Sequence, residues 1–509
     1  MLVKVNSAAI SGLDGIVVEV EVDSIRGLPG QSIVGLPDAA VKESRDRVRF
    51  AISNSGFEFP PGYFTINLAP ADIRKEGPIY DLPIALGMLA SSEQIKPDLL
   101  TETVILGELS LDGGLKPVNG VLPICMSLTR TKKIKKVIVP KDNADEAALV
   151  SDIDIIPCES LIKAARFLDG KEEIKPHIID IKALFMADPF YDFDFSDVKG
   201  QGHAKRALEV AAAGGHNILM VGSPGSGKTM LARRFPTILP PLSINEALEV
   251  TKLFSITGLL SSRNSLITTR PFRSPHHTTS DIGIIGGGRI PRPGEVSLAH
   301  MGVLFLDEFP EFERDVLEVL RQPLEDGVVT IARAMSSVTF PAEFILVAAM
   351  NPCPCGNYMD PTKTCICPSY KVQRYWGKLS GPLLDRIDLH VEVPRLKKEE
   401  LSSVPNGETS QVIRERVSKA RNIQVERFKG MKVHSNSRML PKHVREFCKL
   451  DIQAESLLKS AILQLKMSGR SYDRILKVSR TIADLEGAEQ IKANHIAEAI
   501  QYRSLDRGK

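Results

Sequence analysis

The stretch GSPGSGKT, residues 222–229, follows the apolar run ILMV at 218–221. This order predicts a buried strand, a glycine-rich turn and the start of a helix. Such a turn points successive backbone N–H groups inward, where they can cradle phosphates. The expected nucleotide-binding residues are Gly222, Ser223, Pro224, Gly225, Ser226, Gly227, Lys228 and Thr229. Lys228 is expected to reach the β- and γ-phosphates and Thr229 to ligate Mg²⁺. The alternative is a glycine-rich turn that binds no ligand.

Two further apolar runs end in the polar residues that ATP hydrolysis needs. The run GVLFL at 302–306 ends in Asp307 and Glu308, and the run FILVAAM at 344–350 ends in Asn351. Three buried strands of this kind fit a parallel sheet with its ligand at the carboxyl edge. We expect Asp307 to hold Mg²⁺ through its water shell, Glu308 to polarise the attacking water, and Asn351 to orient that water. The alternative is that these acids only begin loops.

Length and composition indicate a globular protein of two to four domains. The chain has 509 residues, of which 43% are hydrophobic and 25% charged. A net charge of +3 is too small to indicate nucleic-acid binding by itself. The sequence has no apolar run of membrane-spanning length and no basic segment followed by an apolar core at its N-terminus. We therefore expect a cytoplasmic protein with no membrane partner.

Four of the seven cysteines, Cys353, Cys355, Cys365 and Cys367, lie within fifteen residues. In a reducing compartment, clustered thiols fit a tetrahedral zinc site better than disulfides. The Cys-x-Cys spacing is tighter than the usual Cys-x₂-Cys spacing of zinc sites, so reduced thiols without a metal are the alternative. The isolated cysteines are expected to be small core residues, and these are Cys125, Cys158 and Cys448.

The chain divides by pattern into three parts and a linker. Residues 1–175 alternate short strands with helices. The expected strands are 15–22, 64–68, 104–107 and 136–140, and the expected helices are 39–54 and 82–91. Residues 176–195 form a linker, residues 196–395 hold the nucleotide-binding motifs, and residues 396–509 show amphipathic helices. The predicted class is α/β with a helical C-terminal region.

Several motifs of the central part resemble the magnesium-chelatase-like AAA+ ATPases. They are PFRSPHH at 271–277, GGG at 286–288, PGE at 293–295, LAH at 298–300 and NPCPCG at 351–356. Within that family, the whole chain resembles the YifB/ComM group of hexameric DNA branch-migration motors. The resemblance implies an AAA+ P-loop parallel sheet with a C-terminal helical lid, ATP and Mg²⁺ as cofactors, and one ATP between each pair of subunits.

The resemblance also assigns two arginines. SGPLLDRID at 380–388 resembles the arginine-finger segment, so Arg386 would serve the ATP of a neighbouring subunit. The alternative is a surface arginine paired with Asp385 or Asp388. SGRSYDR at 468–474 resembles the sensor-2 segment, in which Arg470 is the expected γ-phosphate contact and Arg474, one turn later, is the second choice.

Two segments resemble the inserts with which such motors contact DNA. Residues 280–293 resemble the helix-2 insert and carry Arg289 and Arg292, and the hairpin-like residues 328–340 carry Arg333. Glycine-rich tips with one or two arginines suit a pore that follows phosphates without reading bases. The alternative is that these arginines pair with surface acids. The adjacent His276 and His277 have no further ligand nearby in sequence, so we expect them to cap or pack rather than to bind a metal.

The first 175 residues resemble the proteolytic domain of the Lon protease, an α+β domain. The matching stretches are KEGP at 75–78, GELSLDGGLKPVNG at 107–120 and VIVPKDN at 137–143. Lon-type hydrolysis needs a serine and a lysine. This sequence has Ile79 and Leu122 at those places, so we expect no peptidase activity and a role in assembly or in guiding DNA.

The function implied by these resemblances is an ATP-driven motor that forms a homo-hexamer and migrates DNA branches. It would act on single-stranded and branched DNA in homologous recombination during natural transformation. Two alternatives belong to other classes: a metal chelatase subunit, and a chaperone-type ATPase that remodels a protein.

Overall fold

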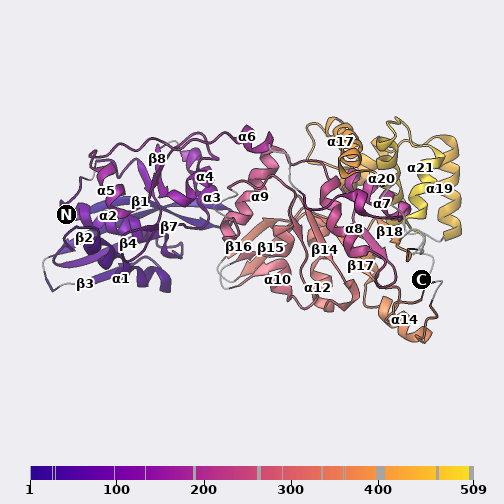
Figure 1. Ribbon diagram of the computed structural model, residues 1–509, viewed down its shortest axis with the longest axis horizontal. Helices are drawn as coiled ribbons and strands as arrows, with labels where there is room; N and C mark the ends of the chain where they lie inside the picture. The colour runs from indigo at the N-terminus through magenta and orange to yellow at the C-terminus, as the bar shows by residue number, and fades with distance from the viewer. Residues whose placement is uncertain are drawn as a thin grey trace. The chain divides into compact units, whose positions relative to one another are not determined.

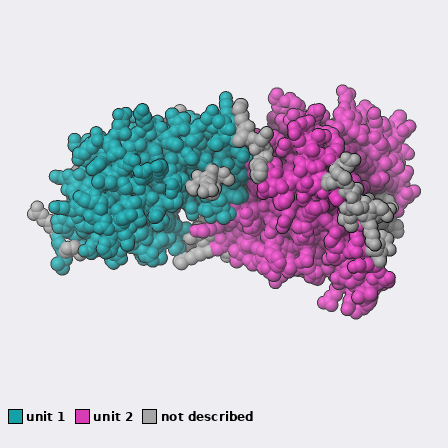
Figure 2. Space-filling view, in the orientation of Figure 1, with its two compact units in different colours: residues 1–188, 244–268 teal, residues 189–243, 269–509 magenta. Residues whose placement is uncertain are grey.

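The computed structural model describes most of the chain (Figure 1). The described residues are 2–25, 27–28, 30–96, 98–131, 133–186, 191–260, 265–288, 291–333, 336–358, 360, 363–396, 407–465 and 469–503. They divide into two units, which Figure 2 shows in different colours, and each unit has its own hydrophobic core. The first unit combines residues 1–188 with 244–268, and the second combines residues 189–243 with 269–509. The predicted α/β class with a parallel sheet and a helical C-terminal region is confirmed.

The first unit is built on a mixed sheet in the order β3-β4-β2-β1-β5-β8-β9. Its strands are β1 (Val3–Ser11), β2 (Asp14–Ile25), β3 (Gly30–Val34), β4 (Tyr63–Ala69), β5 (Thr103–Ile105), β8 (Lys136–Pro140) and β9 (Asp154–Cys158). A short pair, β6 (Glu108–Leu109) and β7 (Leu115–Lys116), lies apart from it. Strand β2 pairs antiparallel with β1 and with β4, whereas β5, β8 and β9 pair in parallel. The four predicted strands are confirmed.

Seven helices of the first unit are α1 (Ala39–Asn54), α2 (Asp81–Ser91), α3 (Val121–Leu128), α4 (Ala144–Ala147), α5 (Leu161–Leu168), α6 (Ile181–Met186) and α9 (Ile244–Thr257). Helix α1 has the predicted bounds because the Asp38 side chain caps it, accepting a hydrogen bond from the Val41 N–H at 2.8 Å. Every residue of α2 is buried, as in a helix that is apolar on all sides. Ile79 and Leu122, which stand at the Lon dyad positions, are buried apolar side chains. The absence of peptidase activity stays a prediction.

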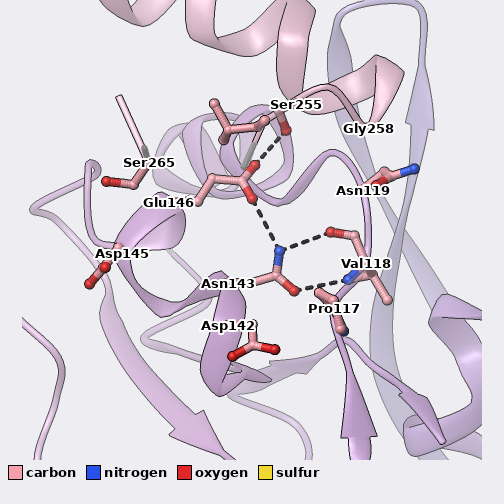
Figure 3. A pocket seen from close by; sticks show the side chains of 11 residues that line it. Pro117, Val118, Asn119, Asp142, Asn143, Asp145, Glu146, Ser255, Gly258 and Ser265 are labelled. Atoms are coloured by element: carbon pink, nitrogen blue, oxygen red, sulfur yellow. Dashed lines mark hydrogen bonds between the residues drawn. The ribbon is translucent and has the colours of Figure 1, made fainter. Parts of the chain in front are cut away.

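Helix α9 follows the phosphate-binding motif in sequence but packs against α3 in the first unit. The Ser255 hydroxyl of α9 donates to the buried carboxylate of Glu146 (Figure 3). That carboxylate also accepts from the Leu122 N–H at 2.9 Å and from the Asn143 amide at 3.1 Å. Burial raises the Glu146 pKa, and these hydrogen bonds oppose the rise. The structure therefore departs from the expected continuous segment 196–395, because residues 244–268 find their packing partners in the first unit.

The second unit contains a five-stranded sheet in the order β11-β14-β17-β10-β18. Its strands are β10 (Ile218–Val221), β11 (Phe272–Arg273), β14 (Val303–Leu306), β17 (Ile345–Met350) and β18 (Leu389–Glu392), and all the pairings are parallel. Strands β10 and β14 are buried throughout, as expected of a parallel sheet covered on both faces. The three predicted strands are therefore neighbours, and their carboxyl ends lie at one edge of the sheet.

The remaining elements of the second unit include two small hairpins and many helices. The hairpins are β12 (Gly286–Gly287) with β13 (Arg292–Pro293), and β15 (Val328–Arg333) with β16 (Ser336–Pro341). The helices of this unit that precede its C-terminal region are α7 (Gly202–Gly214), α8 (Lys228–Arg234), α10 (Asp281–Ile285), α11 (Glu295–Leu298), α12 (Arg314–Val319), α13 (Arg321–Asp326), α14 (Ser369–Trp376) and α15 (Gly381–Leu384). Within the described ranges, no helix has both the length and the apolar character needed to cross a bilayer.

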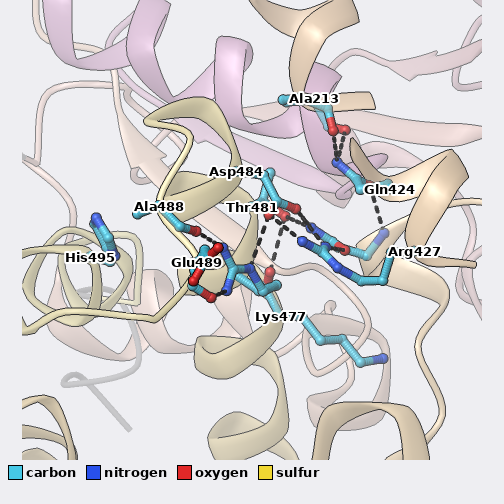
Figure 4. Close-up of polar contacts among 12 residues, drawn as sticks. Ala213, Gln424, Arg427, Lys477, Thr481, Asp484, Ala488, Glu489 and His495 are labelled. Carbon is cyan, nitrogen blue, oxygen red and sulfur yellow. Dashed lines mark hydrogen bonds and ion pairs between the residues drawn. The ribbon is translucent and has the colours of Figure 1, made fainter. Parts of the chain in front are cut away.

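The C-terminal helical region is held together by a buried carboxylate (Figure 4). It comprises α17 (Ser410–Arg427), α18 (Pro441–Phe447), α19 (Ile452–Leu465), α20 (Gly469–Leu485) and α21 (Ala493–Gln501). Arg427 of α17 donates twice to Asp484 of α20, at 2.7 and 2.5 Å. Asn436 and Arg480 donate to the same carboxylate at 2.8 and 3.0 Å. A buried charge needs such partners, so this network fixes α17 against α20.

Candidate nucleotide-binding site

The turn between β10 and α8 has the backbone geometry of a phosphate-binding loop. Gly227, just before α8, has a φ of 97°, which is a left-handed conformation that favours glycine. At Gly222, an added Cβ would lie 2.2 Å from the carbonyl oxygen of Val393, so a larger residue does not fit there. Helix α8 begins at Lys228, and its N-terminal N–H groups face the turn. This arrangement fits the phosphates of a nucleotide.

The ammonium group of Lys228 lies among oxygens from two parts of the chain. It donates to the carbonyls of Gly222 and Ser223 at 2.7 and 3.1 Å, and its Nζ lies 3.3 Å from the Asn351 side-chain oxygen. The contact with Asn351 exists because β10 and β17 are neighbours in the sheet. Burial lowers the Lys228 pKa, and the negative charge of Asp307 opposes this effect.

Thr229 and Asp307 form the oxygen pair expected of a magnesium site. The Thr229 hydroxyl donates to the Asp307 carboxylate at 2.7 Å. The second oxygen of that carboxylate accepts from the Glu308 N–H at 2.9 Å. Mg²⁺ prefers such oxygen ligands and keeps several waters when it is bound with a nucleotide. The residues present therefore fit a Mg²⁺ ion, which Thr229 and Asp307 would hold.

Glu308 has an unusual backbone and a partner that the sequence analysis missed. Its φ of 52° and ψ of 41° place a non-glycine residue in the left-handed region, and such strain is concentrated at functional sites. The side chain is 57% exposed, and its Oε2 lies 3.2 Å from Nδ1 of His277. His277 follows β11, the strand next to β14 in the sheet. The local sequence did not indicate this contact, because β11 has only two residues and was not among the predicted strands.

These residues line one cavity of about 630 Å³ in the second unit. The lining residues are Pro224, Gly225, Ser226, Gly227, Lys228, Thr229, Met230, Ser274, Pro275, His276, His277, Asp307, Glu308, Met350 and Asn351. The structure thus brings together the residues expected from the phosphate-binding loop and from two strand ends. Neither Arg386 nor Arg470 is among the described residues that line the cavity.

Arg386 instead makes an ion pair with Glu325, near the end of α13. Its side chain is 9% exposed and also donates to the Pro382 carbonyl at 2.5 Å. The hydrogen bond from Arg386 lowers the Glu325 pKa, and the positive charge of Arg470 lowers it further. The acid paired with Arg386 is therefore neither Asp385 nor Asp388. The roles of Arg386 and Arg470 in ATP hydrolysis stay predictions.

The second arginine of the sensor-like segment has a different environment. Arg474 is largely buried, donates to the Ile387 carbonyl at 3.4 Å and lies 3.9 Å from the Asp388 carboxylate. Arg470 is exposed. These surroundings favour a structural role for Arg474 and leave Arg470 accessible to a ligand.

The four clustered cysteines come together as the sequence predicted. Their sulfur atoms all lie within 4.8 Å of one another, and the cysteines are Cys353, Cys355, Cys365 and Cys367. Cys353 lies 3.4 Å from Cys355, and Cys365 lies 3.7 Å from both. A tetrahedral zinc–thiolate site with Zn–S bonds of about 2.3 Å has sulfur–sulfur distances of about 3.8 Å. The four thiols therefore fit a zinc ion.

The arginines predicted to contact DNA are only partly described. Arg292 lies in β13 and is exposed. Arg333 ends β15 in the expected hairpin, and its backbone is described. Arg289 lies outside the described residues. DNA contact by these residues stays a prediction.

Three family profiles match this sequence. The family described as "Magnesium chelatase, subunit ChlI" matches residues 194–401, "Subunit ChlI of Mg-chelatase" matches residues 20–143, and "Magnesium chelatase, subunit ChlI C-terminal" matches residues 407–503.

The relatives include proteins of nearly the same length. Competence protein ComM of Haemophilus influenzae is 45% identical over 508 residues, covering 99% of this chain and 97% of that protein. The uncharacterized protein YifB of Escherichia coli is 45% identical over 507 residues, with the same coverage. The magnesium-chelatase 38 kDa subunit of Rhodobacter capsulatus is 24% identical over 327 residues, covering 60% of this chain and 84% of that subunit. The chain therefore belongs to the ComM/YifB family of magnesium-chelatase-like AAA+ proteins.

Proposed function

We propose that the protein is an ATP-driven DNA motor that migrates DNA branches in homologous recombination during natural transformation. The observation that carries the ATPase part is the cavity in which the phosphate-binding loop meets Asp307, Glu308 and Asn351. The choice of DNA as the substrate is supported by 45% identity, over almost the whole chain, to a protein named for competence.

Five residues of the cavity have separate roles in the proposed hydrolysis. Bound Mg²⁺ would neutralise charge on the β- and γ-phosphates. Thr229 and Asp307, whose oxygens lie 2.7 Å apart, would hold that ion, and Lys228 would add its positive charge from the loop. Glu308 would accept a proton from the attacking water, and Asn351 would orient that water.

We propose that the subunits form a head-to-tail homo-hexamer. Arg386 is not among the described residues lining the cavity of its own chain, and it would act on the nucleotide of the next subunit. A cation supplied in this way stabilises charge that develops in the transition state. In a head-to-tail assembly, one face of each subunit contacts a different face of the next subunit. Such contacts close into a ring when the rotation between neighbouring subunits allows it, and a ring suits a motor that encircles DNA.

A second candidate is an ATPase that remodels a protein, as a chelatase subunit or a chaperone would. The observation that favours it is the match to the magnesium-chelatase 38 kDa subunit, which covers 60% of this chain. The two candidate functions use the same ATP site. They differ in the macromolecule that stimulates ATP hydrolysis, which is DNA for the motor and a protein for the remodelling ATPase.

ATPase rates of the full-length protein separate the candidates. They should be measured alone, with single-stranded DNA, with a four-way junction and with an unfolded protein, and Lys228→Ala provides the background. We expect stimulation by both DNA ligands and strand exchange on a labelled junction. Stimulation by unfolded protein but not by DNA would replace the motor with the remodelling function.

We also propose that the four cysteines bind one structural zinc ion. The proposal is supported by the sulfur–sulfur distances of 3.4 to 3.7 Å among Cys353, Cys355 and Cys365. Metal analysis of purified protein should give about one equivalent of zinc per chain. A zinc content near zero in protein purified without chelators would contradict it.

A further inference from the structure

The four-cysteine segment packs directly against the tip of the phosphate-binding loop. Gly356, between Cys355 and Cys365, has a φ of 79°, and its N–H donates to the Cys353 carbonyl at 2.9 Å. A Cβ added to Gly356 would lie 2.4 Å from Cδ of Pro224. The backbone of the segment therefore rests on the proline ring, at a distance that leaves no space for a side chain.

A second contact reaches the same proline through an arginine. Arg395, which follows β18, donates from Nη2 to the Pro224 carbonyl at 3.3 Å. Its Nε lies 3.6 Å from the carboxylate of Asp360, whose side chain is fully buried. Asp360 belongs to the cysteine segment. The segment thus supports both the ring of Pro224 and, through Arg395, its carbonyl group.

The same segment begins beside Asn351, a second residue that lines the cavity. Cys353 follows Asn351 by two residues, and the Asn351 oxygen lies 3.3 Å from the Lys228 ammonium group. The carbonyl of Pro352 accepts from the Trp376 indole at 3.0 Å. The segment therefore links the residue expected to orient water with the tip of the loop expected to hold phosphates.

Regular secondary structure does not account for the shape of this segment. The described residues between β17 and α14 form turns and bends without a helix or strand. Ordering such a segment costs conformational entropy, and a cross-link between its two ends reduces that cost. The sulfur atoms of Cys353, Cys355, Cys365 and Cys367 lie within 4.8 Å of one another, so one zinc ion bound by all four would provide such a cross-link.

We propose that zinc bound by the four cysteines sets the affinity of the neighbouring nucleotide site. The ion would hold Gly356 and Asp360 in place, and these would keep Pro224 and the phosphate-binding loop in the conformation that accepts phosphates. Without the ion, nucleotide would have to order the segment as well as bind. The inference rests on the proposed zinc centre and on the proposed nucleotide site.

Two variants test the inference in different ways. Cys365→Ser/Cys367→Ser removes two zinc ligands. Gly356→Ala keeps all four thiols but places a methyl group against Pro224 in a strained backbone conformation. Cys448→Ser, a buried cysteine outside the cluster, is the matched control. Zinc is measured by mass spectrometry, nucleotide affinity by titration with a fluorescent ADP analogue in Mg²⁺ buffer, and folding by circular dichroism.

For folded protein, we expect the double serine variant to lose zinc and to bind nucleotide roughly tenfold more weakly, because the site is no longer pre-organised. Gly356→Ala should retain zinc and show a similar loss, and the control should match the wild type. Loss of zinc with unchanged affinity, or normal affinity in Gly356→Ala, would overturn the inference while the nucleotide site stands. A wild type that contains no zinc would overturn the zinc centre and the inference. A wild type that binds no nucleotide would overturn the proposed function itself, and the inference with it.

Discussion

Nδ1 of His277 lies 3.2 Å from the carboxylate of Glu308, so a residue after β11 contacts the residue proposed to activate water after β14. The ring of the preceding residue, His276, lies tilted against the ring of His277, with ring centroids 4.1 Å apart. Phe312 packs edge-on against His277 at 6.4 Å. The imidazole is therefore held in place, and it can fix the direction of a carboxylate that is otherwise exposed.

His277→Ala should lower the kcat of ATP hydrolysis about tenfold with little change in KM, because a loosely placed base affects the chemical step more than binding. Steady-state ATPase rates measure both constants. His203→Ala is the control, since His203 is exposed and is not among the described residues that line the cavity. Equal effects of the two substitutions would argue against a positioning role for His277.

Lys228→Ala and Glu308→Gln should separate binding from hydrolysis. Lys228→Ala removes the ammonium group beside the loop carbonyls and should abolish nucleotide binding in a fluorescence titration. Glu308→Gln keeps the shape of the side chain but removes the base, so binding should persist while kcat falls by about 10²-fold or more. Normal turnover in Glu308→Gln would show that another group activates the water.

Arg386→Ala should leave each subunit able to bind nucleotide and lower hydrolysis by about 10³-fold, since the proposed finger acts only in the transition state. Mixing Arg386→Ala with Lys228→Ala subunits tests whether the arginine acts on a neighbour. Some sites in mixed rings combine an intact loop with an intact arginine, so activity should return above that of either variant alone. If the mixture hydrolysed ATP no faster than the sum of the two variants measured separately, Arg386 would not act on the nucleotide of a neighbouring subunit.

Asp388 should make the second unit sensitive to acid. Burial alone would raise the pKa of this carboxyl, but the hydrogen bond with His216 and the positive charges of His216, Arg474 and Lys477 lower it to about 2. Because the pKa of Asp388 in the folded state lies below the ordinary value of 3.8, its ionised carboxylate stabilises the folded state above about pH 4. That contribution, about 2 kcal/mol, is lost as the pH falls from 4 towards 2.

Denaturant unfolding of Asp388→Asn measures this contribution, followed by the fluorescence of Trp376, which is the single tryptophan and lies in the second unit. The variant should be less stable than the wild type at pH 7, and the difference should shrink towards pH 2. Glu426→Gln, at an exposed position, is the control and should change stability little at either pH. A difference that does not depend on pH would mean that the ionised form of Asp388 contributes nothing.

The sequence alone predicted the elements whose signals are local. The motif at 222–229 lies between a strand and a helix as expected, because the apolar run before it and the glycines within it act over a few residues. Helix α1 has its predicted bounds because its cap is in the adjacent sequence. The meeting of Lys228 with Asn351 and of Thr229 with Asp307 also followed, since parallel strands present their ends at one edge.

Tertiary structure decided the pairings whose partners lie far apart in the chain. Helix α9 follows the phosphate-binding loop in sequence, yet it joins the first unit because α3 and Glu146 cover its buried face. Local sequence also does not predict the ion pair of Arg386 with Glu325 or the contact of Gly356 with Pro224. A sequence pattern shows which face of an element is apolar or which residue is charged, but the partner that satisfies it is selected by packing across the whole fold.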